Sequence, residues 1–332
     1  MNELLKVENL SVEITTRRGI ARVVDGLTLA VPAGETFAIV GESGCGKSMT
    51  ALTVMGLLPA PEARVTSGHI WLEGEDLLAV SEARRREVRG NRVAMIFQEP
   101  MTSLNPVFTV GEQIAEAARA HLGLSRRAAW GRAIEMMQMV HIPAPEKRAQ
   151  DYPHQFSGGM RQRAMIAMAL VCEPKLIIAD EPTTALDVTI QAQIFELLLE
   201  LQRSRGTTLV LITHDMAAVS EVARRVMVMY AGRKVEEGDV ENVLSKPMHP
   251  YTKGLLACRL RLAVSLTGER EPLPEIPGVV PSLDRLGPGC HFAPRCQFAM
   301  PRCLVEAPPL FGDEGRGRAA CWLIQEDSPQ AS

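Results

Sequence analysis

The sequence predicts an α/β protein: a parallel sheet with an antiparallel β-layer, a helical insert, and a small irregular C-terminal domain rich in cysteine and proline. In the middle of the chain, short runs of Val, Ile and Leu alternate with helical patterns, as in parallel sheets. Helical patterns alone occupy residues 99–157, and after His249 the periodicity fades while proline, glycine and cysteine become frequent. We therefore expect a main domain at 1–255 and an extension at 256–332.

The first part of the chain favours the antiparallel layer. Apolar and polar residues alternate there with a period of two, and short clusters of Gly, Pro and Arg separate the runs. The expected strands are residues 5–10, 21–24 and 27–31.

A glycine-rich loop follows a buried strand at 36–40 and leads into a helix at 49–55. The glycines let successive backbone N–H groups point inward, where they form a cradle for phosphate oxygens with the positive end of the helix. Lys47 adds a charge for the β- and γ-phosphates, and the Ser48 hydroxyl can ligate Mg²⁺. This order of elements predicts a nucleotide-binding P-loop. The residues expected at the nucleotide are Gly41, Ser43, Gly44, Cys45, Gly46, Lys47, Ser48 and Met49.

Polar residues follow the apolar strands of the core. Gln98 ends one strand, the pair Asp180 and Glu181 ends another, and His214 follows a third. Since the carboxyl ends of parallel strands meet at one edge, we expect these side chains to face the crevice of the P-loop. The remaining expected strands are 67–72, 92–97, 175–179 and 208–213, and the clearest expected helices are 110–117, 128–140 and 190–203.

Together these segments resemble the ATPase subunit of ABC transporters over about residues 4–255. The resemblance implies hydrolysis of ATP with Mg²⁺. It implies that Glu181 is the general base, that Asp180 holds Mg²⁺ through water, and that His214 reaches the γ-phosphate. The implied catalytic residues are Glu181, His214, Gln98 and Lys47, and the implied Mg²⁺ site is Ser48, Gln98 and Asp180.

The segment Ser157-Gly158-Gly159 offers a second anion site, with a hydroxyl and two glycine N–H groups at the start of a helix. In the family resembled, it caps the γ-phosphate bound to the opposite subunit, so hydrolysis implies a dimer with an identical or homologous ATPase subunit. Residues 185–187 resemble the loop that joins the two active sites. Phe156 and Met160 depart from the family's generic Leu-Ser-Gly-Gly-Gln and resemble its peptide-importer branch.

Recognition of the adenine base stays open. Many relatives place an aromatic ring ahead of the P-loop to stack on the base, but residues 17–20 contain none. The guanidinium of Arg18 can stack on a base, and it can equally be an ordinary surface group.

Two features narrow the resemblance to the dipeptide and oligopeptide importer ATPases: residues 99–106, and His249-Pro250-Tyr251 at the start of the extension. This branch implies two transmembrane permease subunits, an extracytoplasmic solute-binding protein, and a peripheral position on the cytoplasmic face of the bacterial inner membrane. The cargo stays open, because relatives move short peptides, glutathione, nickel complexes and some sugars.

The extension holds four of the seven cysteines: Cys290, Cys296, Cys303 and Cys321. Soft thiolates at one site favour zinc or an iron–sulfur cluster, and the tight Cys pairs typical of structural zinc are absent from the sequence. Several relatives in the branch resemble this chain in carrying a four-cysteine [4Fe–4S] site here, so the cluster is the first expectation. Zinc and unligated thiols are the alternatives.

Composition sets further limits. The net charge of −3 gives no electrostatic argument for binding nucleic acid or an anionic bilayer, and no apolar run is long enough to span a membrane. The first residues lack a signal-peptide pattern, so we expect a cytoplasmic chain. The rival classes are an ABC ATPase acting on DNA or ribosomes, and a P-loop kinase. Finally, Cys45 lies beside Lys47 at a helix start, which predicts an acidic thiol that alkylating reagents reach.

Overall fold

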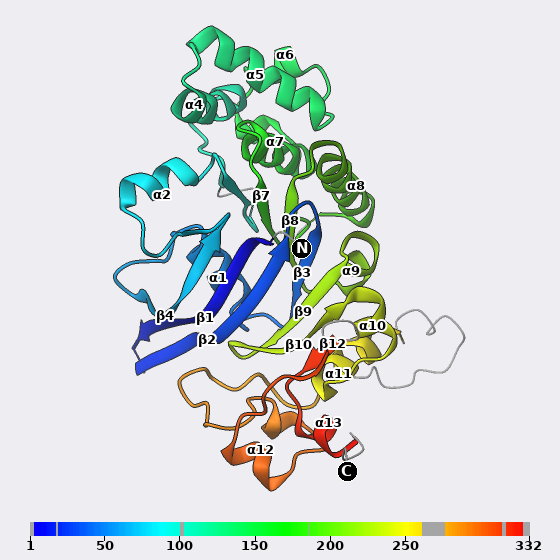
Figure 1. Ribbon diagram of the computed structural model, residues 1–332. Coiled ribbons are helices and arrows are strands. Elements are labelled where there is room, and N and C mark those ends of the chain that lie inside the picture. The colour runs from blue at the N-terminus through cyan, green and yellow to red at the C-terminus, as the bar shows by residue number, and fades with distance from the viewer. Residues whose placement is uncertain are drawn as a thin grey trace, which may run out of the picture.

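The computed structural model describes residues 3–17, 19–99, 103–184, 186–260, 276–313 and 317–327. It confirms the α/β class. A central sheet carries helices around it, a smaller antiparallel sheet lies beside it, the helical insert lies at one end, and the extension lies at the other (Figure 1).

The central sheet has the strand order β11-β12-β10-β9-β3-β8-β7-β6 in the described residues. Strands β9, β3, β8, β7 and β6 run parallel, and β10, β12 and β11 continue the sheet in antiparallel pairs. Their bounds are β3 Thr36–Val40, β6 Val93–Ile96, β7 Leu176–Asp180, β8 Thr208–Thr213, β9 Arg225–Tyr230, β10 Arg233–Asp239, β11 Phe311–Asp313 and β12 Gly317–Ala319.

The smaller sheet has the order β2-β1-β4-β5. The expected strands 21–24 and 27–31 are in fact one strand, because β2 continues through a register shift near Gly26, whose φ of +62° accommodates the irregularity. The expected strand at 67–72 begins earlier. The bounds are β1 Glu3–Thr16, β2 Gly19–Pro32, β4 Ala63–Leu72 and β5 Glu75–Asp76.

The helices follow from periodic apolar faces and local caps. Ser81, Thr109, Ser125, Ser157 and Asp187 each accept a hydrogen bond from the first turn of the helix that they begin. The helices are α1 Lys47–Val54, α2 Glu82–Val88, α4 Val110–Leu122, α5 Arg126–Met139, α6 Pro145–Arg148, α7 Gly158–Leu170, α8 Val188–Arg205, α9 Met216–Val222, α10 Val240–Ser245, α11 Pro250–Leu260, α12 Pro301–Val305 and α13 Trp322–Asp327, with 3₁₀ turns at Pro153–Gln155 and Ala293–Arg295.

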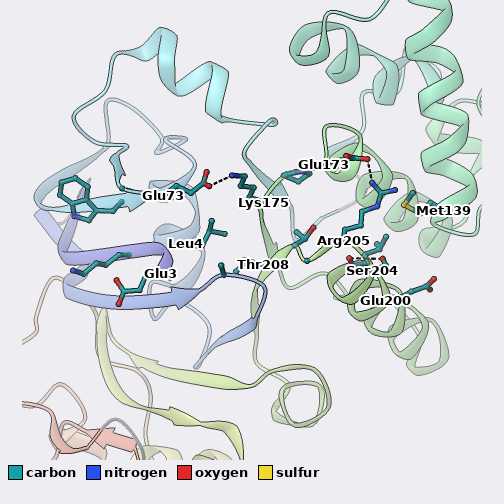
Figure 2. A pocket seen from close by; sticks show the side chains of 18 of the residues that line it. Glu3, Leu4, Glu73, Met139, Glu173, Lys175, Glu200, Ser204, Arg205 and Thr208 are labelled. Carbon is teal, nitrogen blue, oxygen red and sulfur yellow. Dashed lines mark hydrogen bonds and ion pairs between the residues drawn. The ribbon is translucent and has the colours of Figure 1, made fainter. Parts of the chain in front are cut away.

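A cavity of about 1620 Å³ lies where β7 and β8 begin, at the edge of the sheet opposite the P-loop (Figure 2). Several of its charged side chains pair with one another. Glu73 accepts a hydrogen bond from Lys175, and Glu173 pairs with Arg205. The residues that line it include none of the predicted nucleotide contacts, so this cavity is not the candidate site.

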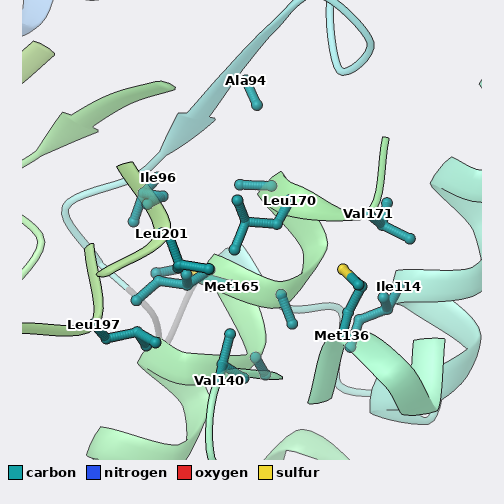
Figure 3. Close-up of a cluster of buried hydrophobic side chains, with 14 of the residues drawn as sticks. Ala94, Ile96, Ile114, Met136, Val140, Met165, Leu170, Val171, Leu197 and Leu201 are labelled. Atoms are coloured by element: carbon teal, nitrogen blue, oxygen red, sulfur yellow. The ribbon is translucent and has the colours of Figure 1, made fainter. Parts of the chain in front are cut away.

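A hydrophobic cluster joins the helical insert to the sheet (Figure 3). Met165 and Leu170 of α7 lie between Ile96 at the end of β6 and the insert, where Ile114 and Met136 are fully buried. The insert and the sheet therefore share one continuous hydrophobic core.

The extension is attached to the main domain. Strand β12 pairs with β10, and α11, the helix that leads into the extension, is fixed by Tyr251, which is fully buried against Tyr230 of β9 with ring centroids 4.7 Å apart. Across the part of the chain that the structure describes, no helix is both long and apolar enough to cross a membrane.

Candidate nucleotide-binding site

The loop between β3 and α1 has the conformation that its glycines were expected to allow. Gly41, Gly44 and Gly46 have φ angles of +154°, +79° and +101°. A Cβ atom on Gly41 would lie 2.2 Å from the carbonyl oxygen of Met229, and one on Gly46 would lie 2.3 Å from that of Val23. Only glycine fits at these two positions, because the backbone of neighbouring strands passes directly behind the loop.

The Lys47 side chain folds back over the loop. Its Nζ donates to the carbonyl oxygens of Gly41, at 2.7 Å, and Glu42, at 3.0 Å, and the residue is 4% exposed. The ammonium group therefore lies over the loop, where it could contact phosphate oxygens. Its present partners are carbonyl oxygens of the loop itself.

Ser48 and Asp180 meet at the end of β7. The Ser48 hydroxyl donates to Asp180 Oδ1 at 3.1 Å, and Asp180 is 4% exposed. Burial raises the pKa of Asp180, partly offset by this hydrogen bond. A hydroxyl and a carboxylate in contact are the oxygen ligands that Mg²⁺ prefers, so these residues fit the expected ion.

Glu181 lies at the centre of a hydrogen-bond network. Its Oε2 accepts from Gln98 Nε2 and from the Thr184 hydroxyl, both at 3.0 Å. The Nδ1 atom of His214 lies 3.4 Å from Oε1. The residue has a φ of +45°, and its N–H donates to Ile212 of β8. Gln98, Glu181 and His214, which follow three different strands, thus converge. Thr184 was not predicted, because nothing in its local sequence marks it as a partner of Glu181.

Ser157 caps α7, accepting a hydrogen bond from the N–H of Met160 at 3.3 Å. Ser157 and Gly158 are exposed, so the start of this helix is accessible to another molecule. Asp187 caps α8 in the same way. Roles were also expected for Arg18 and Ala185, which lie outside the described residues.

The expectation of a reactive Cys45 is wrong. The residue is 1% exposed, and burial raises the pKa of its thiol despite the nearby Lys47. The loop curls around Cys45 and desolvates it, and this effect outweighs the charge and the helix end that the sequence suggested.

The four late cysteines line one small cavity of about 20 Å³ with Phe292, Phe298 and Trp322. Burial raises the pKa of Cys290 to about 11, and raises the pKa of Cys296 and Cys321 as well. Within the described ranges, no group of three or more His, Cys, Asp or Glu side chains is arranged to hold a metal ion. The four thiols therefore share a site, without the spacing that a single ion would need.

The parallel sheet, the P-loop and the Glu181 network define a nucleotide-binding cassette. Two family models match the chain. The ABC transporter model matches residues 24–184, and the model of the oligopeptide/dipeptide transporter C-terminal region matches residues 235–303.

Relatives extend over nearly the whole chain. A probable peptide ABC transporter ATP-binding protein of Sinorhizobium fredii, y4tR, is 50% identical and covers 97% of this chain and 96% of its own. The oligopeptide transport ATP-binding protein AppD of Bacillus subtilis is 47% identical over all of both chains. The solved dimeric post-hydrolysis structure of the cassette MJ0796, bound to ADP and Pi, is 26% identical with a TM-score of 0.64, and covers 71% of this chain and 98% of its own.

The chain belongs to the ABC transporter family of ATP-binding proteins, in the branch that carries the oligopeptide/dipeptide transporter C-terminal region. It is an ATPase of the ABC type.

Proposed function

We propose that this chain is the subunit that hydrolyses ATP to power the import of short peptides through a membrane ABC transporter. The names of its relatives support the peptide cargo. The observation that carries the hydrolytic role is the Glu181 carboxylate, held by Gln98 and Thr184 beside the Ser48–Asp180 pair. Glutathione or a nickel complex is the alternative cargo.

The proposed reaction begins when the triphosphate enters the P-loop. Lys47 exchanges its bonds to the carbonyl oxygens of Gly41 and Glu42 for bonds to phosphate oxygens, and the loop's N–H groups bind the remaining ones. Ser48, Asp180 and Gln98 would hold Mg²⁺, which neutralises charge on the phosphates. Contacts from Gly41, Ser43, Gly44, Cys45, Gly46 and Met49 complete the nucleotide site.

Glu181 then acts as general base. Its carboxylate orients a water molecule in line with the γ-phosphate and accepts its proton, while Gln98 and His214 keep the carboxylate and the water in place. His214 is 68% exposed in its side chain, so it can move from Glu181 to the γ-phosphate oxygen.

The second half of the site comes from another ATPase subunit. The exposed segment Ser157-Gly158-Gly159 would cap the γ-phosphate held by the opposite subunit, so that two chains enclose two ATP molecules. The second chain can be identical or homologous. The comparison with a dimeric cassette supports this arrangement.

In the assembled transporter we propose two permease subunits and an extracytoplasmic binding protein as partners, with the chain on the cytoplasmic face of the bacterial inner membrane and no nucleic acid involved. The helical insert at 99–157 would transmit closure to the permease. We also propose a division into a nucleotide-binding domain at 1–255 and an extension at 256–332.

For the four cysteines we propose a [4Fe–4S] cluster that stabilises the extension. The four cysteines line one cavity with Phe292, Phe298 and Trp322, and their sulfur atoms are soft metal ligands once deprotonated. Burial disfavours the thiolate of Cys290 unless a cation neutralises it. Anaerobically purified protein should contain iron and acid-labile sulfide in equal amounts, and the variant Cys303→Ser should lose both. Zinc alone, or no metal, would contradict the cluster.

The ATPase activity of the chain reconstituted with its permease should rise when peptide-loaded binding protein is added. The variant Glu181→Gln should lower the turnover rate by about 100-fold or more while Mg-ATP still binds. Turnover that ignores the loaded binding protein would contradict the importer, and a phosphorylated small-molecule product would show a kinase.

A further inference from the structure

The second residue of the P-loop, Glu42, is held by two residues that follow far later in the chain, Tyr251 and Arg295. Its backbone N–H donates to the hydroxyl of Tyr251 at 2.8 Å. Its carboxylate accepts two hydrogen bonds from Arg295, at 2.7 Å and 3.2 Å. With Lys47 on its carbonyl oxygen at 3.0 Å, Glu42 is bonded through its N–H, its carbonyl and its side chain.

Arg295 is itself fixed in place. Its side chain is 7% exposed, and its remaining N–H groups donate to the carbonyl oxygens of Pro277 and Ile276 and to the hydroxyl of Tyr230. A planar guanidinium with every nitrogen bonded has a defined position, so it can set the position of the carboxylate that it binds.

Tyr251 is equally rigid. It is fully buried, with its ring against those of Tyr230 and Phe292, at centroid separations of 4.7 Å and 5.4 Å. Its hydroxyl therefore presents an acceptor to the Glu42 N–H from a fixed direction. That N–H is bonded to Tyr251, so Glu42 serves the loop as an anchor rather than as a ligand for phosphate.

We propose that Tyr251 and Arg295 are positioning residues of the nucleotide site, which hold the P-loop in its phosphate-binding shape through Glu42. The inference rests on the proposed role of the loop. The contacts come from residues 251 and 295, which both lie in the region matched by the oligopeptide/dipeptide transporter C-terminal model, residues 235–303.

The test is the affinity of the full-length chain for Mg-ADP, measured by titration calorimetry, together with the KM for ATP. The variants Arg295→Gln and Glu42→Gln should each weaken Mg-ADP binding about tenfold, and Tyr251→Phe about threefold or more. The turnover rate at saturating ATP should change less than twofold, because a filled loop is held by its ligand. The double variant of Arg295 and Glu42 should bind Mg-ADP no more weakly than either single variant, since each substitution removes the same contact.

Arg84→Gln is the matched control, because Arg84 makes a similar two-bond contact with Glu75 away from the loop. It should leave the affinity unchanged. Thermal unfolding shows whether the Arg295 and Tyr251 variants are folded. If they are folded and their affinity for Mg-ADP is within twofold of the parent's, the proposal is wrong. Independent losses that add in the double variant would also overturn it.

The parent protein and Lys47→Ala separate this outcome from failure of the proposed function. If the parent binds Mg-ADP and the Lys47→Ala variant fails to bind it, the nucleotide site is supported, whatever the result for the Arg295, Glu42 and Tyr251 variants. A parent that fails to bind would overturn the proposed function itself.

Discussion

Two glycines of the P-loop differ in what a methyl group would meet, and this difference gives a quantitative prediction. Gly44 and Gly46 both have positive φ angles, +79° and +101°. A Cβ on Gly44 meets nothing within 4 Å, whereas one on Gly46 lies 2.3 Å from the carbonyl oxygen of Val23 in β2. Both alanine variants pay for the left-handed backbone, but only Gly46→Ala also forces neighbouring backbone to move.

The left-handed conformation alone costs roughly 1–2 kcal/mol for a residue with a Cβ. Gly44→Ala should therefore lower the free energy of unfolding by about that amount. The overlap with Val23 adds a cost like that of an overpacked core, about 1–3 kcal/mol. At about 2–4 °C per kcal/mol for a domain of this size class, Gly46→Ala should melt several degrees below Gly44→Ala.

Thermal unfolding of both variants without nucleotide gives the comparison, and calorimetric titration with Mg-ADP gives the consequence for binding. We expect Gly46→Ala to displace the loop from β2 and to bind nucleotide more weakly than Gly44→Ala does. Equal melting temperatures for the two variants would refute the reasoning, because the close approach of Val23 would then carry no cost.

Three further predictions concern single residues. Thr184→Val removes one hydrogen bond to Glu181, worth about 1 kcal/mol, and should lower the turnover rate about fivefold. Thr66→Val is the control and should leave the rate unchanged, because the Thr66 hydroxyl bonds the carbonyl oxygen of Ser11. An unchanged rate for Thr184→Val would show that Thr184 has no part in the Glu181 network. Burial lowers the pKa of His249 to about 3, whereas the same imidazole has a pKa of about 6.5 in the unfolded chain. As the pH falls below about 6.5, the unfolded state therefore takes up a proton at His249 that the folded state does not, and the folded state loses stability. The parent should lose about 1 kcal/mol more stability than His249→Gln between pH 6.5 and 5.5 by denaturant unfolding, and parallel curves would contradict this. Cys45 should react with maleimide at least tenfold more slowly in the folded chain than after unfolding, as read by mass spectrometry of the peptide, and equal rates would contradict its burial.

The P-loop and the strand ends could be predicted from the sequence because their signals are local. Apolar runs mark the buried strands, and the glycines of the loop mark a backbone that only glycine adopts. The convergence of Gln98 and His214 on Glu181 followed from the rule that parallel strands end at one edge.

Other features depend on contacts between distant parts of the chain. Strands β9 and β10 both went unpredicted. In β10, Glu236 and Glu237 interrupt the apolar pattern. Both are buried, and their carboxylates are satisfied by the N–H groups of Met248 and His249 and by Lys234 and Arg318. The anchor from Arg295 to Glu42 spans 253 positions, so no local pattern could indicate it.

The central claim is that the triphosphate lies between the P-loop of one subunit and the Ser157 helix start of another. Analytical ultracentrifugation of Glu181→Gln, with its native ATPase partner if the pair is heteromeric, tests this most directly, with Mg-ATP and with Mg-ADP. We expect a dimer with Mg-ATP, monomers with Mg-ADP, and monomers with Mg-ATP once Ser157→Arg is added. A variant that binds Mg-ATP yet stays monomeric, or a dimer that persists with Ser157→Arg, would contradict the account.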